Sequence, residues 1–297
     1  MTALVSTDLF SRHAMIGFAF RDASDQSLIA DGLDIKLADT LIPARSVQLV
    51  PTPSGTWMTV RLPGIGIELE GKPEDWPANR RSFTVEVEDR LGRFLPTRFE
   101  AELPMRGRFV WPSWAGFNEA RTRPLVPADP PEGFVPDYLP LFPSIARTPP
   151  GPRATVRATI ALRQDDGSDS PAGWAAVTVS VSNRVVGLGV ADAGGAVAVS
   201  FPYPDLPDQS VEEAAAGRSE VSWDATIRVY YSALEGDPPD LADILGQLSQ
   251  TSTPTFATLV PAVTPLPAQP LVLGRPLIAA TMRNATERFS SLYLETA

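Results

Sequence analysis

Apolar and polar residues alternate with a period of two along several short stretches, as in strands that bury one face. The clearest stretch spans 154–162, where one face carries Ala154, Val156, Ala158, Ile160 and Leu162. Further strands are expected at 17–20, 45–50, 56–62, 83–87, 175–181, 185–191, 196–201 and 221–231. The pattern therefore predicts an all-β fold in which each sheet hides its apolar face against another sheet.

Short runs rich in Asp, Gly, Ser and Pro separate these strands and predict turns. They lie at 21–25, 51–55, 89–92, 165–168 and 192–195. The last run, Asp-Ala-Gly-Gly, lies between two strand-like stretches, so we expect 185–191 and 196–201 to form a hairpin. The run at 51–55 is expected to connect 45–50 to 56–62 in the same way.

Helical patterns are scarce. One short helix is predicted after Asp237, because the apolar residues there follow helical spacing: Leu241, Ile244, Leu245 and Leu248. Asp237 is its expected N-cap, since proline follows it directly. A second helix of about two turns is expected at 210–217, where Ser210 and Glu213 form a capping-box pattern.

Proline divides the chain. Twelve of the 31 prolines lie between Pro104 and Pro152, and six lie between Pro254 and Pro276. Proline is excluded from helix interiors and central strands, so these stretches are expected to be extended connectors. The predicted organisation is a β-sandwich at 1–105, a proline-rich connector at 106–150, a second β-sandwich at 151–235, and a helix, arm and closing strands at 236–297. The closing strands, at 271–273 and 291–294, are expected to pair with an earlier sheet.

Composition narrows the possible chemistry. The 297 residues include no cysteine and one histidine, which excludes disulfides, thiolate-bound zinc and a zinc site with several imidazoles. The 25 basic and 35 acidic residues give a net charge of −10, which disfavours nucleic-acid binding. No apolar run reaches the ~18 residues of a membrane span, and the N-terminus lacks a basic leader. We therefore expect no membrane span and a cytoplasmic location.

The candidate chemical groups have simpler interpretations. His13 has no nucleophile motif to serve as a base. A predicted turn carries three carboxylates that could bind calcium, Asp165, Asp166 and Asp169, but an ordinary acidic turn is favoured. Alternating glutamates such as Glu86 and Glu88 are more typical of a solvated strand face than of a glycosidase. We expect no catalytic residue, no cofactor and no metal, and hence no enzyme.

The connector is the strongest candidate for a binding function, because it is rich in aromatic residues and arginines. The candidate partner interface comprises Phe109, Trp111, Trp114, Phe117, Phe134, Tyr138 and Phe142. Such side chains do not stay exposed on a monomer without reason. Either they cover the chain's own sandwiches or they dock on another subunit, where aromatics and arginine are enriched. Rows of aromatics also bind sugars, so a carbohydrate- or surface-binding module is an alternative.

A weak internal repeat leads to a family resemblance. The segments 53–64 and 192–202 each contain a glycine turn, then a strand, then a proline. The stretch Gly189–Val199, with Pro202 after it, is similar to the Asp-x-x-Gly segment of carboxypeptidase regulatory-like, or transthyretin-like, β-sandwiches. The earlier segment matches more loosely. This resemblance implies that one sandwich type is used twice.

The wider layout resembles proteins encoded in phage-tail-like contractile injection system clusters. The similar stretches are EDRLGRFLPTRF at 88–99, LPLFPS at 139–144 and FPYP at 201–204. The resemblance implies a non-enzymatic structural subunit, expected as a cap or adaptor at one end of the particle, with a baseplate position as the alternative. It implies tube, sheath, cap or baseplate proteins as partners, homo-oligomerisation within the assembly, and a particle that forms in the cytoplasm and can be released.

Overall fold

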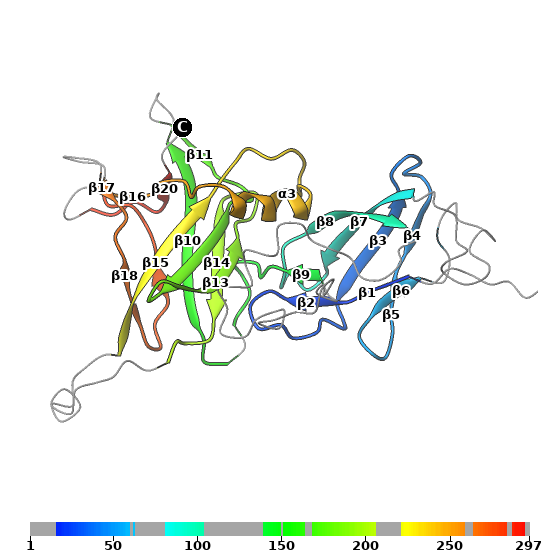
Figure 1. Ribbon diagram of the computed structural model, residues 1–297, viewed down its shortest axis with the longest axis horizontal. Helices are drawn as coiled ribbons and strands as arrows, with labels where there is room; N and C mark the ends of the chain where they lie inside the picture. Colours follow the sequence, from blue (N-terminus) through cyan, green and yellow to red (C-terminus); the bar gives the residue numbers. More distant parts are fainter. Residues whose placement is uncertain are drawn as a thin grey trace, which may run out of the picture.

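The structure is a computed structural model of the 297-residue chain. It describes residues 16–59, 62, 81–103, 139–149, 151–163, 168–205, 221–258, 264–283 and 287–294. This part of the chain forms two β-sandwiches with a short α-helix between them (Figure 1). The predicted all-β fold class is confirmed.

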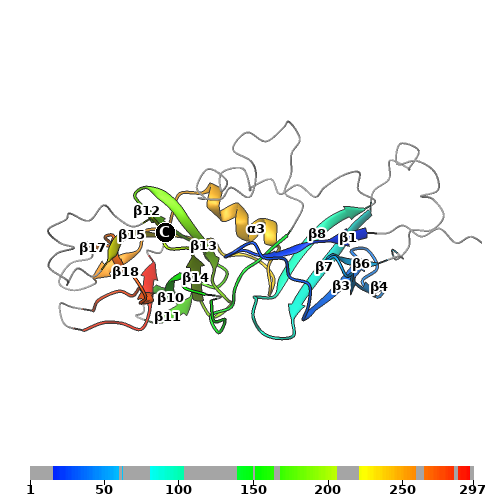
Figure 2. The same ribbon diagram turned by 90° about the horizontal axis from the view of Figure 1, so that it is seen from below.

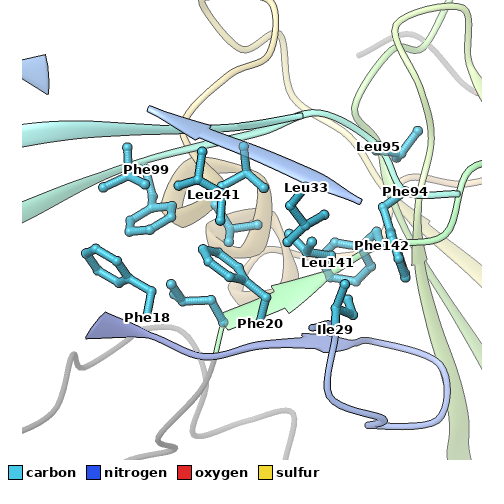
Figure 3. Packing of buried hydrophobic residues seen from close by; sticks show 14 of the residues in the cluster. Phe18, Phe20, Ile29, Leu33, Phe94, Leu95, Phe99, Leu141, Phe142 and Leu241 are labelled. Carbon is cyan, nitrogen blue, oxygen red and sulfur yellow. The ribbon is translucent and has the colours of Figure 1, made fainter. Parts of the chain in front are cut away.

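The first sandwich faces one four-stranded sheet against two smaller sheets. The antiparallel four-stranded sheet has the order β4 (Ser46–Gln48), β3 (Leu33–Asp39), β7 (Arg81–Asp89) and β8 (Thr97–Leu103). The smaller sheets are β1 (Ile16–Phe18), β6 (Trp57–Thr59) and β5 (Val50–Pro51), and the parallel pair β2 (Phe20–Asp22) and β9 (Leu139–Leu141). The rings of Phe18 and Phe99 meet edge to face across the layers, with centroids 5.6 Å apart (Figure 3).

Strand β7 shows why the alternation was informative. Phe83, Val85 and Val87 are buried in the core, while Glu86 on the opposite face lies 3.7 Å from the exposed Lys36 ammonium. Successive residues of the strand thus alternate between an apolar side chain in the core and a polar side chain on the outer face. The strand predicted from this pattern is confirmed.

Part of the range predicted as connector belongs to the first sandwich. Strand β9 pairs in parallel with β2, and Leu139 N donates to Ala19 O at 2.7 Å. Leu95 N then donates to Phe142 O at 2.9 Å. The stretch from Leu139 therefore supplies a strand and core side chains. Its prolines, Pro140 and Pro143, are compatible with this pairing because they lie where the ladder needs no N–H donor.

The second sandwich combines the central block with the tail. One sheet contains β11 (Asp169–Pro171), β10 (Ala154–Arg163) and β14 (Ala196–Phe201), with β19 (Leu277–Ile278) and β20 (Leu292–Leu294) paired in parallel with β10. The other has the order β13 (Arg184–Val190), β12 (Ala176–Val181), β15 (Ser222–Tyr230) and β18 (Gln269–Val272). A two-stranded ribbon joins β16 (Phe256–Thr258) to β17 (Thr264–Pro265). The predicted pairing of the tail with an earlier sheet is confirmed.

The hairpin predicted around 192–195 is wrong, although the turn is present. Gly195 N donates to Asp192 O, and Asp192 N to Ala196 O, both at 2.9 Å. The strands on either side nevertheless join opposite sheets, β13 with β12 and β14 with β10. The inner face of β13 carries Gly187 and Gly189, and the side chains of Val199 and Phe201 occupy the space that larger residues would fill. The two strands therefore pack face to face instead of edge to edge.

The hairpin in this region lies one strand earlier. Strands β12 and β13 are antiparallel neighbours joined by Ser182 and Asn183, whose φ angles are 50° and 61°. Two consecutive positive φ angles define a type I′ turn, whose twist matches that of the flanking strands. Asparagine adopts this conformation more readily than most residues, so Asn183 was the available sequence signal.

The internal repeat is reproduced in the two glycine turns. Gly55 and Gly195 both have a φ of 80°. Gly55 N donates to Thr52 O at 2.9 Å and Thr52 N to Thr56 O at 2.8 Å, the same two bonds that Asp192 makes in the second turn. The side-chain oxygen of the first residue also accepts from the residue after the glycine in both turns, at 3.2 and 2.9 Å. The first turn closes a short hairpin of β5 and β6, which confirms the predicted hairpin only in part, because residues 46–48 of the predicted strand 45–50 form β4 and pair with β3.

Helix α3 (Leu241–Gly246) and the 3-10 turn η3 (Gln247–Ser249) join the two sandwiches. The predicted N-cap Asp237 is wrong: Asp240 caps the helix, and its carboxylate accepts from Ala242 N at 2.8 Å. The apolar spacing was informative, because Leu241, Ile244 and Leu245 are all buried. They share one hydrophobic cluster with the first sandwich and with Trp174, Leu188 and Val190 of the second (Figures 1 and 2). The second predicted helix, at 210–217, lies outside the described residues.

Candidate protein-docking surface

Six of the seven aromatic residues predicted to form a partner interface lie outside the described residues. They are Phe109, Trp111, Trp114, Phe117, Phe134 and Tyr138. The structure therefore leaves their role as a prediction.

The seventh residue, Phe142, is corrected by the structure. Its side chain is only 3% exposed and belongs to the core of the first sandwich, near Phe94 and Leu141 (Figure 3). The neighbouring Pro143 forms a β-bridge with Phe94. Phe142 is thus an internal packing residue, because β9 carries it between the layers.

The chain enters and leaves the aromatic-rich segment 104–138 at residues whose surroundings are described. Leu103, the last described residue before it, pairs with Arg81 at the end of the four-stranded sheet. Next to this pair, Thr40 N donates to Ser82 O at 3.1 Å. Leu103 therefore lies beside the loop that connects β3 to β4.

That loop carries the most exposed apolar side chain of the described residues. Leu41 is 88% exposed and Ile42 is 42% exposed, and Pro43 and Ala44 are exposed as well. Single exposed apolar residues are common on protein surfaces, but four in succession at the tip of one loop are typical of a contact site. We refer to residues 41–44 as the apolar tip.

The apolar tip is held in place by a buried carboxylate. Asp39 is 3% exposed, and its Oδ1 accepts hydrogen bonds from Leu41 N at 2.9 Å and from Ile42 N at 3.3 Å. Backbone bonds close the loop, from Arg45 N to Ile42 O at 2.8 Å and from Asp39 N to Arg45 O at 3.1 Å. A loop fixed in this way loses little conformational entropy when it binds a partner.

Two arginines lie at this end of the sandwich. Arg45 is exposed at the base of the apolar tip. Arg81 Nη1 lies 3.8 Å from Asp39 Oδ2, and the arginine side chain remains 45% exposed while the carboxylate faces inward. The tip sequence itself contains no acidic residue, although the whole chain carries a charge of −10. The combination of leucine, isoleucine and arginine is suited to a protein contact with an apolar centre and a charged rim.

The acidic turn considered as a calcium site is only partly described. Asp165 and Asp166 lie outside the described residues, while Asp169 Oδ2 accepts a hydrogen bond from the Tyr293 hydroxyl at 2.5 Å. Burial, followed by the hydrogen bond to Asp169 and its charge, raises the pKa of Tyr293 to about 12. Asp169 thus fastens strand β20 to β11. Across the described ranges, no group of three or more His, Asp or Glu residues could hold a metal ion.

The other candidate groups follow the simpler interpretation where they are described. Glu86 and Glu88 are exposed on the outer face of β7, and Glu86 pairs with Lys36. On the same sheet Arg90 Nη2 lies 2.8 Å from Asp34 Oδ2. Glu86 and Glu88 thus lie on a solvated strand face, as expected, and Glu86 and Asp34 form exposed ion pairs. His13 lies outside the described residues.

The sequence reasoning did not single out the apolar tip. Its signal was an apolar run, Leu-Ile-Pro-Ala, placed directly after a strand that ends in aspartate. Such a run is ambiguous without the structure, because it is equally compatible with a buried strand end.

Comparison with known proteins adds no family. No protein-family model matches the chain, and no curated protein matches its sequence. Among the described residues, no helix combines the length and apolar character needed to cross a membrane.

Proposed function

We propose that this chain is a structural, non-enzymatic subunit of a contractile phage-tail-like injection particle, and that it acts as a cap or adaptor at one end. The observation that carries the proposal is the apolar tip, an exposed Leu41-Ile42 pair fixed by the buried Asp39. A fixed apolar projection beside two arginines suits docking on another protein, because little order must be gained on binding. The sequence resemblance to proteins of injection-system clusters supplies the kind of particle.

The chain's architecture supports an adaptor role. Adaptors between particle parts of different symmetry need a rigid body and extended segments that reach neighbouring subunits. Leu103, the last described residue before the aromatic-rich segment 104–138, lies beside the loop that carries the apolar tip. Assembly would take place in the cytoplasm, with several copies in each particle.

The test compares two leucines that are both exposed on turns of the first sandwich. The tagged parent, Leu41→Asp and Leu91→Asp are expressed in the organism that encodes the chain, and what co-purifies is imaged by negative stain. Leu91 is 62% exposed on the turn between β7 and β8, so its variant is the matched control. The proposal predicts tail-like tubes or sheaths with the parent and with Leu91→Asp. Leu41→Asp should recover at least roughly tenfold fewer, as for loss of an interface anchor.

Two outcomes would overturn the proposal. One is a parent protein that purifies as a monomer without any particle, which would favour the carbohydrate-binding alternative. The other is recovery of particles by Leu41→Asp at the level of Leu91→Asp, which would remove the apolar tip from the contact.

A further inference from the structure

The two sandwiches meet at a polar contact as well as through helix α3. Arg153, directly before β10, donates from Nη2 to the carbonyl oxygen of Ser24 in the first sandwich, at 2.5 Å. Burial lowers the pKa of Arg153, while the charges of Asp25 and Asp22 act in the opposite direction. A guanidinium that has left solvent is anchored by the few acceptors it meets, so this contact fixes the start of the second sandwich on the first.

The same turn of the first sandwich holds a second arginine. Asp22 is 1% exposed, and its Oδ1 accepts from Ser24 N at 2.7 Å and from Ser24 Oγ at 2.6 Å. Its other oxygen forms an ion pair with Arg147, whose guanidinium lies 4.5 Å from the centre of the Phe94 ring. Arg147, in the middle of the link between β9 and β10, and Arg153, at its end, thus both contact the 22–25 turn.

Helix α3 and the η3 turn that follows it are held by both sandwiches. Gln247 is 1% exposed; its Nε2 donates to Trp174 O at 2.9 Å and its Oε1 accepts from Ser232 N at 2.9 Å. Both partners lie in the second sandwich. Towards the first sandwich, the apolar face of α3 packs into the shared core, the Asp240 carboxylate accepts a hydrogen bond from the backbone of Glu100, and Asp240 forms a bridge with Arg98 of β8.

We infer that the junction is a two-point latch, with the Asp22, Arg147 and Arg153 cluster at one point and the apolar face of α3 against β8 at the other. The closed latch holds the two sandwiches as one rigid body and so fixes the direction of the apolar tip relative to the second sandwich. Opening of the latch uncovers apolar side chains that are buried in the closed state, among them Leu241 and Leu245. The latch does not depend on what the chain binds.

Spin labels can test the latch directly, because the chain has no cysteine of its own. One label is placed at Lys36→Cys on β3 and the other at Arg184→Cys at the start of β13, both exposed positions. The distribution of distances between them is measured by double electron–electron resonance. The variants Arg153→Gln and Leu245→Ala each weaken one point of the latch. Arg45→Gln is the control, because this exposed arginine directly precedes β4, at the end of the first sandwich away from the second (Figure 1).

The latch predicts a single narrow distance distribution in the doubly labelled parent and in Arg45→Gln. Arg153→Gln should add a second, longer population, and the combination with Leu245→Ala should make that population dominant. Circular dichroism shows whether each variant keeps its β-structure; should the combination unfold, Arg153→Gln alone decides. A broad distribution in the parent, or an Arg153→Gln distribution identical to that of Arg45→Gln, would overturn the inference.

Discussion

Gly195 offers a sharp test of how the second sandwich is built. It has a φ of 80° in the turn that carries the chain from β13 in one sheet to β14 in the other. Its carbonyl oxygen accepts from Ile160 N at 2.7 Å. A Cβ at this position would overlap the backbone carbonyl oxygen of Ile160. Because that atom is part of the β10 ladder, it cannot move aside as a flexible side chain could.

The expected loss of stability of Gly195→Ala has three parts. The left-handed conformation costs about 1–2 kcal/mol for a residue with a Cβ, of which about 0.4–1 kcal/mol is offset by the stiffer unfolded chain. Loss of the hydrogen bond to Ile160 removes about 1 kcal/mol. Displacement of packed backbone adds about 1–3 kcal/mol, as in other overpacked sites. Together these terms lower the free energy of unfolding by about 2–6 kcal/mol.

Gly92→Ala is the matched control. Gly92 has a φ of 66°, but a Cβ there would meet no described atom within 4 Å. Only the conformational part remains, so about 1 kcal/mol is expected. Urea unfolding followed by tryptophan fluorescence and circular dichroism measures both variants. Equal losses in the two variants, within about 0.5 kcal/mol, would show that the turn does not approach β10 as described.

Three further predictions follow from the carboxylates and Tyr293. Asp39→Ala should destabilise the chain by about 1–3 kcal/mol and speed hydrogen exchange at the Leu41 amide, because it removes the bonds that fix the apolar tip. Burial acts to raise the pKa of Asp89, but the hydrogen bonds and the charge of Arg93 together outweigh it, so the pKa is lowered. The stability that this carboxylate contributes is present above its pKa in the unfolded chain and is lost as the pH falls through its pKa in the folded chain. The free energy of unfolding, measured by urea titration at decreasing pH, should therefore fall less steeply for Asp89→Asn than for the parent. The pKa of Tyr293 is raised from 10.0 to about 12, so its contribution to the free energy of unfolding is lost as the pH rises through that interval. In Tyr293→Phe the free energy of unfolding should therefore fall less steeply between these pH values. A slope equal to that of the parent would contradict the bond to Asp169.

Much of the fold follows from side-chain periodicity. Strands β7 and β10 were predictable because each is long and one face of each is buried, so the alternation of Phe83, Val85 and Val87 or of Val156 and Ile160 is uninterrupted. The apolar spacing of α3 was predictable for the same reason. The N-cap of α3 was not predictable, because Asp237 and Asp240 both precede the helix and aspartate has the same N-cap preference at either position.

The pairing of strands was less predictable than their existence. The turn at 192–195 has hairpin composition, yet the packing of Val199 and Phe201 against Gly187 and Gly189 sends its two strands into different sheets. That choice depends on contacts between residues of both sheets, which local patterns do not contain. Phe142 shows the same limit: only the pairing of β9 with β2 makes it a core residue.

The connector interface stays a prediction for six of its seven aromatic residues, which lie outside the described residues, and the apolar tip was not predicted. Composition indicated binding surfaces, and aromatic enrichment directed attention to the connector. The apolar tip was missed because exposure is a property of the folded chain; Leu41 is as apolar in sequence as the buried Leu37. Its recognition needed the buried Asp39, whose bonds turn the loop outward.

The central claim is that this chain is a structural part of one end of a contractile particle. The most direct measurement is gold labelling of an epitope-tagged parent on tail-like particles purified from the organism that encodes it, viewed by electron microscopy. The account predicts gold at one terminus of the tube and sheath, and little or none along the shaft. Particles that carry no gold, while the tagged protein remains in the soluble fraction as a monomer, would contradict it.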